Sequence, residues 1–217
     1  MRAVPTFPCL SHTHHSLLTE NVSFSYDGTT PALKNVSFKV PPGGRVVVVG
    51  EFGAGKSTIL RLLYRLYKPG EGRILIDGQD IQTVTLSSLR NTIGLLPQDP
   101  VLFNASVGYN IAYGRPSMTP PPQSTIIDAA QAAGIHERIM SFPEGYETRV
   151  GERGVRLSDR EKQGVSIART MVKNPKVLLL DGALDDATER TAFERLVDGR
   201  SCLSISHRLD TIKPTDV

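Results

Sequence analysis

The sequence contains no tryptophan, only two cysteines and no long apolar run. The last two features exclude particular kinds of site and of segment. Cys9 and Cys202 stand far apart and match no metal-binding or redox spacing, so they indicate neither kind of site and favour a reducing compartment. The longest aliphatic runs, Val46–Val49 and Val177–Leu180, have the length of a strand, far short of the roughly 20 residues that cross a bilayer. We therefore expect any membrane role to come through another chain.

The net charge and the length of the chain bear on its partners and on its number of domains. The net charge is only +3, and the basic residues are scattered without a dense block or an aromatic-basic alternation, so no nucleic-acid partner is predicted. With 217 residues, of which 39% are hydrophobic, the chain is long enough for one globular domain with a core. Residues 1–16 resemble neither a transit peptide nor a signal peptide, and we predict residues 1–19 to be a disordered tail.

The stretch VVVVGEFGAGKSTILRLL contains the strongest motif in the chain. Gly50 is followed by four residues and then by Gly55-Lys56-Ser57, which is the spacing of a phosphate-binding loop. Backbone N–H groups and the lysine ammonium of such a loop surround phosphates, and the serine hydroxyl reaches Mg²⁺. A glycine-rich turn without a ligand would account for the glycines, but it gives no reason for the lysine and serine at these offsets. The valine run before the loop and the helical apolar pattern after it supply the required strand and helix.

The remaining pattern predicts an α/β fold with a P-loop NTPase core. Alternation between residues 20 and 40 predicts an N-terminal antiparallel β subdomain, and a helix is expected from 56 to 67. Helical patterns at 124–133 and 160–173 predict a helical subdomain inserted over residues 103–174. We expect residues 20–102 and 175–217 to form the core. Further strands are expected at residues 73–76, 92–96, 177–180 and 203–206.

Three polar residues stand at or just after the ends of predicted core strands, namely Gln98, Asp181 and His207. Ligands of parallel α/β sheets bind at the carboxyl ends of the strands, so we expect all three near the phosphate loop. Taken singly, each has a plain alternative: an amide that caps a loop, a solvated carboxylate and a surface imidazole. Their shared position at strand ends favours a common site.

A set of sequence blocks spanning about residues 20–217 resembles the nucleotide-binding domain of an ABC transporter. The resemblance is strongest to the half-transporter exporters of the mitochondrial iron–sulfur and heavy-metal-tolerance type. It implies ATP and Mg²⁺ as cofactors and ATP hydrolysis coupled to transport as the activity. The blocks that carry it are NVSFSYDG, ALKNVSF, EGRILIDGQDI, LLPQDPVLFN, VGERG, KNPKVLLLD and SISHRLDT.

The resemblance also implies a role for each matching residue. Tyr26 would stack on the adenine, and Ser57, Gln98 and Asp181 would hold Mg²⁺ directly or through water. Gln98 and His207 would be catalytic, because they match the glutamine near the attacking water and the histidine that contacts the γ-phosphate. The phosphates would be held by Gly50, Gly53, Ala54, Gly55, Lys56, Ser57 and Thr58, and in the family's head-to-tail dimer by Ser158 of the second copy.

The chain departs from the family pattern in three places that concern catalysis. Glu51-Phe52 replaces a small or polar pair within the phosphate loop, and the signature LSGGEKQR reads LSDREKQG, with Asp159 and Arg160 in place of two glycines. After Asp181 the family glutamate is missing together with three residues of loop length, since Gly182-Ala183-Leu184-Asp185 follows directly. Asp185 and Asp186 are the remaining carboxylates nearby. We expect binding of ATP with impaired hydrolysis, so whether the chain is an enzyme stays open.

The same resemblance predicts the partners and the place of work. A transmembrane domain supplied by another chain and a head-to-tail nucleotide-domain dimer are expected, at a membrane for which the likeness suggests the mitochondrial inner membrane, matrix side. The chain stops at Val217, where the family continues, so it is expected to be truncated relative to the family. Two alternatives stay open: a nucleotide-binding regulatory module with weak catalysis, and a truncated gene product.

Overall fold

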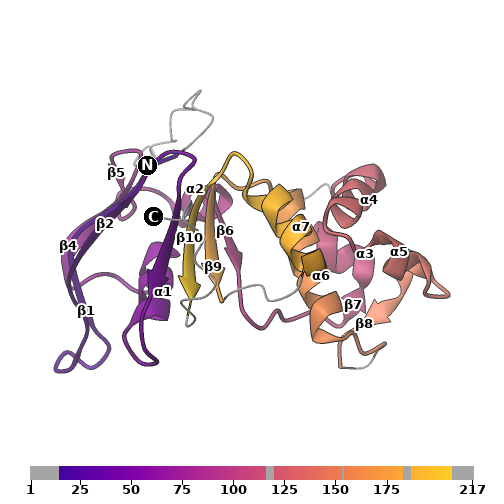
Figure 1. Ribbon diagram of the computed structural model, residues 1–217, viewed down its shortest axis with the longest axis horizontal. Coiled ribbons are helices and arrows are strands. Elements are labelled where there is room, and N and C mark those ends of the chain that lie inside the picture. Colours follow the sequence, from indigo (N-terminus) through magenta and orange to yellow (C-terminus); the bar gives the residue numbers. More distant parts are fainter. Residues whose placement is uncertain (1–14, 116–119, 153, 183–186, 207–217) are drawn as a thin grey trace, which may run out of the picture. The chain divides into compact units, whose positions relative to one another are not determined.

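The computed structural model of the chain describes residues 15–115, 120–152, 154–182 and 187–206, and for residues 187–190 it describes the backbone alone (Figure 1). The chain divides into two compact units. Of the described residues, the first unit comprises 15–95, 176–182 and 199–206, and the second comprises those between 96 and 175 together with 187–198. His207, Asp185 and Asp186 lie outside the described residues.

The first unit contains an antiparallel sheet in the order β2-β1-β4-β5 (Figure 1). Its central strand β1 begins at Leu17, which is fully buried, so the predicted disordered tail is wrong for residues 17–19. The turn after β1 forms as the Asp27-Gly28 pair predicts, because the Asp27 carboxylate accepts hydrogen bonds from the Thr29 and Thr30 N–H groups. The strands are β1 (Leu17–Ser25), β2 (Pro31–Val40), β4 (Glu71–Ile76) and β5 (Gln79–Asp80).

A second sheet of the same unit carries the phosphate loop. Its order is β3-β10-β9-β6, and β10 pairs in parallel with both β3 and β9. Val49 of β3 lies opposite Ser206 of β10, and Asp181 of β9 lies opposite Ile205, so these three strands end at the same edge. The strands are β3 (Arg45–Val49), β6 (Ile93–Leu96), β9 (Val177–Asp181) and β10 (Ser201–Ser206).

Helix α1 (Lys56–Leu63) contributes to the core that both sheets of this unit share (Figure 1). The helix ends four residues earlier than predicted because Arg65 adopts a left-handed conformation and its guanidinium donates to the carbonyls of Ile81 and Val84. Helix α2 (Leu86–Thr92) begins under a Thr85 side-chain cap. The buried apolar residues of α1 are Ile59, Leu60, Leu62 and Leu63.

Truncation of Leu63 should destabilise the first unit strongly. Its side chain is fully buried, so Leu63→Ala removes apolar contacts and leaves a cavity, which costs about 2 to 5 kcal/mol of unfolding free energy. Leu66→Ala is the matched control, because that leucine is 54% exposed just beyond the helix. Denaturant unfolding of both variants measures the difference, and equal losses would contradict the placement of α1 in the core.

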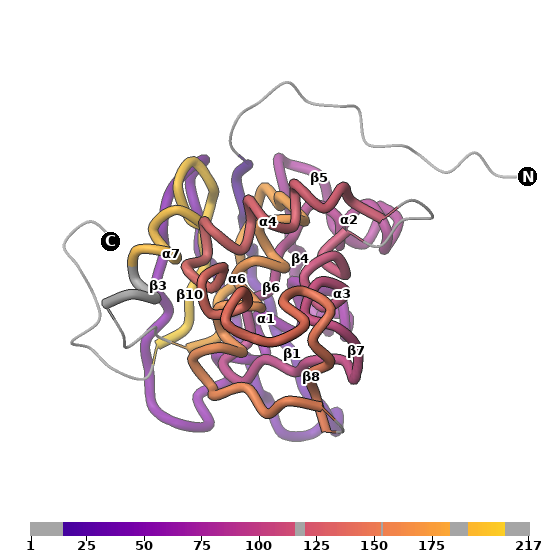
Figure 2. Tube along the Cα trace, turned by 90° about the vertical axis from the view of Figure 1, so that its right-hand side faces the viewer, coloured from indigo at the N-terminus to yellow at the C-terminus, as the bar shows by residue number. Residues whose placement is uncertain are grey.

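The second unit is mainly helical and is built on α6 (Asp159–Lys173), with α3, α4 and α7 packed on it (Figure 2). Partly buried Arg169 of α6 donates to the backbone carbonyl and side-chain oxygen of Asn110, and its partial burial lowers the pKa of the guanidinium. The other elements are α3 (Val107–Ala112), α4 (Gln123–Ala132), α5 (His136–Met140), a 3₁₀ turn (Gly145–Glu147), α7 (Ala187–Val197), and the strands β7 (Ala105–Ser106) and β8 (Arg149–Val150).

The sequence did not predict helix α7 or its unit. The prediction places residues 175–217 in the core, whereas helix α7 belongs to the second unit, which also begins at residue 96 rather than 103. The reason is tertiary, because the apolar side chains near the end of α7 are buried and the helix packs on α6. Those buried side chains are Ala192, Leu196 and Val197.

Candidate functional site: the phosphate loop

The phosphate loop connects the end of β3 to the start of α1. Lys56 is the first residue of the helix, and its side chain is folded back over the loop, leaving the residue only 5% exposed. Its ammonium donates hydrogen bonds of 2.7 Å to the carbonyls of both Gly50 and Glu51. A positive charge is thereby held inside the loop at the edge where the parallel strands end.

Gly55 gives the loop its shape. It caps α1 in the left-handed region, with φ of 83°, and a Cβ atom on it would lie 2.3 Å from the carbonyl oxygen of Ala32. The amides of Lys56 and Ser57, in the first turn, have no intrahelical acceptor, and the N-cap residue Gly55 has no side chain that could accept a hydrogen bond from them. A helix N-terminus of this kind, beside a buried ammonium, suits an anion.

Gly55→Ala should damage both the fold and anion binding. The added methyl group meets backbone rather than a flexible side chain, so the loop must shift, in addition to the roughly 1 to 2 kcal/mol of left-handed strain. Gly53→Ala is the matched control, because Gly53 also has a positive φ, of 81°, but faces open space. Thermal unfolding and phosphate affinity of the two variants measure the difference. Equal behaviour would show that the close approach to Ala32 is unimportant.

Tyr26 lies against the first turns of α1. Its hydroxyl is 3.1 Å from the Thr58 hydroxyl and accepts a 2.9 Å hydrogen bond from Arg61, and these contacts lower the tyrosine pKa against the effect of burial. Its ring meets Phe24 and Tyr67 edge to face, at centroid distances of 4.8 and 5.2 Å. Tyr26 is still 48% exposed, so an aromatic surface remains available close to the phosphate loop.

Arg61 interacts with both Tyr26 and Asp181, and no sequence motif predicted this role. The hydrogen bond to Tyr26 is the main reason that its pKa is raised, and the negative charge of Asp181 adds to the shift. Asp181 is the last residue of β9 and is partly buried. The only sequence signal for Arg61 was its position one helical turn after Thr58.

Comparisons with known proteins identify the family to which the chain belongs. The family profile described as ABC transporter matches residues 33–185, which is more than half of the chain. The chain belongs to the ABC transporter family. It is the nucleotide-binding domain of that family, as its resemblance predicted.

Relatives of this ABC transporter domain include exporters associated with heavy metals. The heavy metal tolerance protein of Schizosaccharomyces pombe is 48% identical over 98% of this chain, and the ATM1-type heavy metal exporter of Novosphingobium aromaticivorans is 50% identical over 98%. A solved bacterial Atm1-family ABC exporter with ATP bound matches with a TM-score of 0.87 and 49% identity over 99% of the chain. The chain spans 26% and 36% of the two relatives and 38% of the solved chain.

Two of the other predicted site residues of this ABC transporter domain, Gln98 and Ser158, fall outside the first unit. Gln98 is exposed and belongs to the second unit, as does Ser158, so their approach to the phosphate loop stays a prediction. His207 follows β10 directly but lies outside the described residues. Ser57 and Asp181 both lie in the first unit, and both are partly exposed.

The structure describes four of the residues that depart from the family pattern, three by the exposure of their side chains and one by its backbone φ. Glu51 is exposed, and Phe52 is 86% exposed. The Asp159 side chain is 98% exposed and accepts a hydrogen bond of 2.8 Å from Lys162, which lowers its pKa. Gly182, at the position of the family glutamate, has a φ of 99°, a conformation that side-chain-bearing residues rarely adopt.

Within the ranges that the structure describes, none of the helices of this ABC transporter domain has the length and apolar content that a membrane crossing requires.

Proposed function

We propose that this chain binds ATP with Mg²⁺ as the ATP-binding domain of an Atm1-type exporter, and that it hydrolyses ATP slowly. The observation that carries the proposal is Lys56, whose ammonium is buried in the phosphate loop and held by two carbonyls. A triphosphate would supply the negative charge that this ammonium and the uncapped helix N-terminus favour. Tyr26, exposed beside the same helix, is where the adenine ring would stack.

The donor set of the first unit fits Mg²⁺. Ser57 offers a hydroxyl oxygen in the first turn of α1, and Asp181 offers a carboxylate at the end of β9. Hard oxygen ligands of this kind, few in number and completed by phosphate oxygens, suit Mg²⁺ bound together with a nucleotide. Gln98 would complete the set from the second unit. When bound, the ion would neutralise phosphate charge.

Slow hydrolysis follows from the residues that replace the family's glutamate after Asp181 and its first signature glycine. Gly182 offers no carboxylate to orient or deprotonate the attacking water, and general-base help of that kind is worth about 10² to 10⁴ in rate. Asp159 places a negative charge at the start of α6, where the partner's γ-phosphate would approach. Gln98 and His207 would then be the remaining catalytic side chains.

The partners follow from the family. We propose a head-to-tail nucleotide-domain dimer docked on a transmembrane domain supplied by another chain, at a membrane such as the mitochondrial inner membrane on its matrix side. The relative named as an ATM1-type heavy metal exporter supports transport as the activity of the whole assembly.

Equilibrium binding of fluorescently labelled ATP with Mg²⁺ to the purified chain tests the nucleotide claim. Saturable binding that depends on Lys56 supports it, and its absence would overturn it. A second candidate function, a nucleotide-binding regulatory module, is favoured by Gly182 and Asp159. Phosphate release measured with the membrane-domain partner present separates the two, because a regulatory module gives no release above a Lys56→Ala background.

A further inference from the structure

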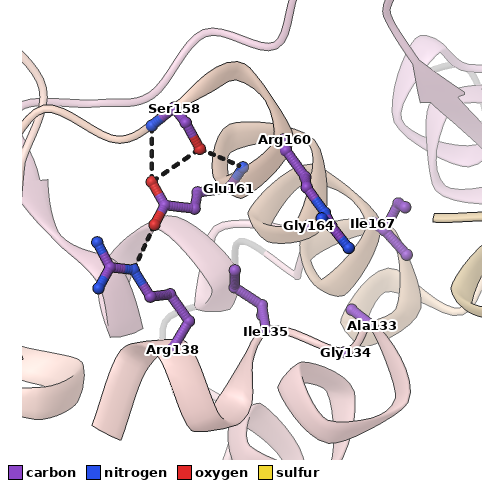
Figure 3. A pocket seen from close by; sticks show the side chains of 9 residues that line it. All are labelled: Ala133, Gly134, Ile135, Arg138, Ser158, Arg160, Glu161, Gly164 and Ile167. Atoms are coloured by element: carbon purple, nitrogen blue, oxygen red, sulfur yellow. Dashed lines mark hydrogen bonds and ion pairs between the residues drawn. The ribbon is translucent and has the colours of Figure 1, made fainter. Parts of the chain in front are cut away.

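Ser158, the serine of the signature loop, is held by a carboxylate of its own helix (Figure 3). Its N–H and its hydroxyl both donate to Oε2 of Glu161, at 2.7 and 2.9 Å, and the Glu161 N–H donates back to the hydroxyl at 3.3 Å. This arrangement is a capping box at the start of α6. The spacing Ser-x-x-Glu was readable from the sequence, but the use of both serine donors was not.

The hydrogen bonds leave Ser158 without a spare donor. Phosphate oxygens only accept hydrogen bonds, and a serine has two donor hydrogens, one on its backbone nitrogen and one on its hydroxyl. Both are directed to the same oxygen of Glu161. A phosphate can therefore bind to Ser158 only if the carboxylate gives up at least one of them.

Arg138, on a different helix, holds the carboxylate in place. Its Nε forms an ion pair with the other oxygen, Oε1, of Glu161, and its guanidinium lies over the ring of Phe142 at 4.6 Å. Burial alone would raise the pKa of Glu161, but the hydrogen bonds from Ser158 and Arg138 lower it, so the carboxylate is charged at neutral pH. Nothing in the sequence around Arg138 indicated this contact.

A pocket beside Glu161 gives its carboxylate room for a second position, away from Ser158. It has a volume of about 290 Å³ and is lined on one side by Ala133, Gly134 and Ile135 and on the other by α6 (Figure 3). The pocket reaches α6 at Gly164, where the side chain of Ile135 closes it, since a Cβ atom on Gly164 would lie 3.2 Å from that side chain. The volume of the pocket beside Arg160 is large enough for the Glu161 carboxylate to turn away from Ser158.

We propose that Arg138 is a positioning residue that keeps Glu161 on Ser158, so that the signature serine can donate to a phosphate only after this carboxylate has swung into the adjoining pocket. The inference rests on the proposed function, in which Ser158 meets the γ-phosphate of ATP bound to a second copy. It assigns control of that contact to a residue of α5, outside the signature loop.

The test uses Arg138→Met, which keeps the length of the side chain but removes the ion pair. Arg73→Met is the matched control, because Arg73 forms an ion pair of the same kind with Glu20 on the antiparallel sheet. Amide hydrogen exchange at Ser158, followed by NMR without nucleotide, is the first readout. We expect exchange to become about tenfold faster in Arg138→Met, as loss of one charge-assisted hydrogen bond allows, unchanged in Arg73→Met, and partly restored in Arg138→Lys.

Self-association with ATP and Mg²⁺, measured by sedimentation, is the second readout. The protein used for this measurement has both Asp159 and Arg160 changed to glycine, so that the signature loop can approach the partner's phosphate. We expect about tenfold tighter association when Arg138→Met is added. Should the variant unfold, Glu161→Gln, which keeps a capping side chain, replaces it with the same expected direction.

The outcomes separate this inference from the proposed function. Unchanged exchange at Ser158, or faster exchange with unchanged association while ATP still binds through Lys56, overturns the inference alone. Failure of the parent chain to bind ATP at all overturns the proposed function and the phosphate contact that depends on it.

Discussion

Replacing Lys56 by alanine should lower the affinity of the chain for ATP by about a hundredfold or more. The ammonium is a charged donor in a mostly buried position, and each charge-assisted hydrogen bond contributes about 1.5 to 3 kcal/mol. Without it, the carbonyls of Gly50 and Glu51 also lose their common donor, so the loop loses the contact that organises it. Both effects act in the same direction.

Fluorescence anisotropy of labelled ATP with Mg²⁺, titrated with wild type and Lys56→Ala, measures this loss. Lys34→Ala is the matched control, because Lys34 is an exposed lysine on β2. Thermal unfolding of each variant shows whether the loop change also affects the fold. Equal affinities of wild type and Lys56→Ala would mean that the phosphate loop does not bind nucleotide in the proposed way.

Restoring the missing catalytic segment should raise ATP hydrolysis by about 10² to 10⁴, the contribution of a general base. The change inserts Glu-Ala-Thr between Asp181 and Gly182 and replaces Asp159 and Arg160 by glycine. The insertion supplies both the carboxylate and the loop length needed to place it, and the glycines remove the charge and bulk that oppose the partner's phosphate.

An insertion of Gln-Ala-Thr is the control for the restored carboxylate, since it has the same length and lacks only the charge. Phosphate release is measured for both insertions, each also with Lys56→Ala to define the background. A rate that rises equally with glutamate and glutamine would assign the defect to loop length. No rise in either would contradict the proposal that Gly182 limits turnover.

The strand, loop and helix around Lys56 could be predicted from the sequence because their determinants are local. The valine run, the glycine spacing and the apolar pattern after them occupy adjacent positions, and α1 begins at Lys56 as the motif predicts. The same holds for α6, whose observed span differs from the predicted one by a single residue at its start. Local hydrogen bonding and side-chain periodicity suffice to specify such elements.

Contacts between distant segments were beyond the sequence pattern. Arg61 reaches Tyr26 across 35 positions, Arg138 reaches Glu161 across 23, and α7 packs on α6 although its own apolar pattern is short. Each of these depends on how elements pack, which brings together side chains that no fixed spacing relates. The predicted end of α1 was wrong for the same reason, since Arg65 is held by carbonyls from a later loop.

Short runs of neighbouring residues identify this protein as an ABC transporter nucleotide-binding domain and specify its phosphate loop, so both could be predicted without the fold. The folded chain was needed to show that the Lys56 ammonium donates to two carbonyls, that Tyr26 contacts Thr58 and Arg61, and that both donors of Ser158 bind Glu161. Hydrogen bonds have direction and saturate, so which donor satisfies which acceptor is settled only when the chain has folded.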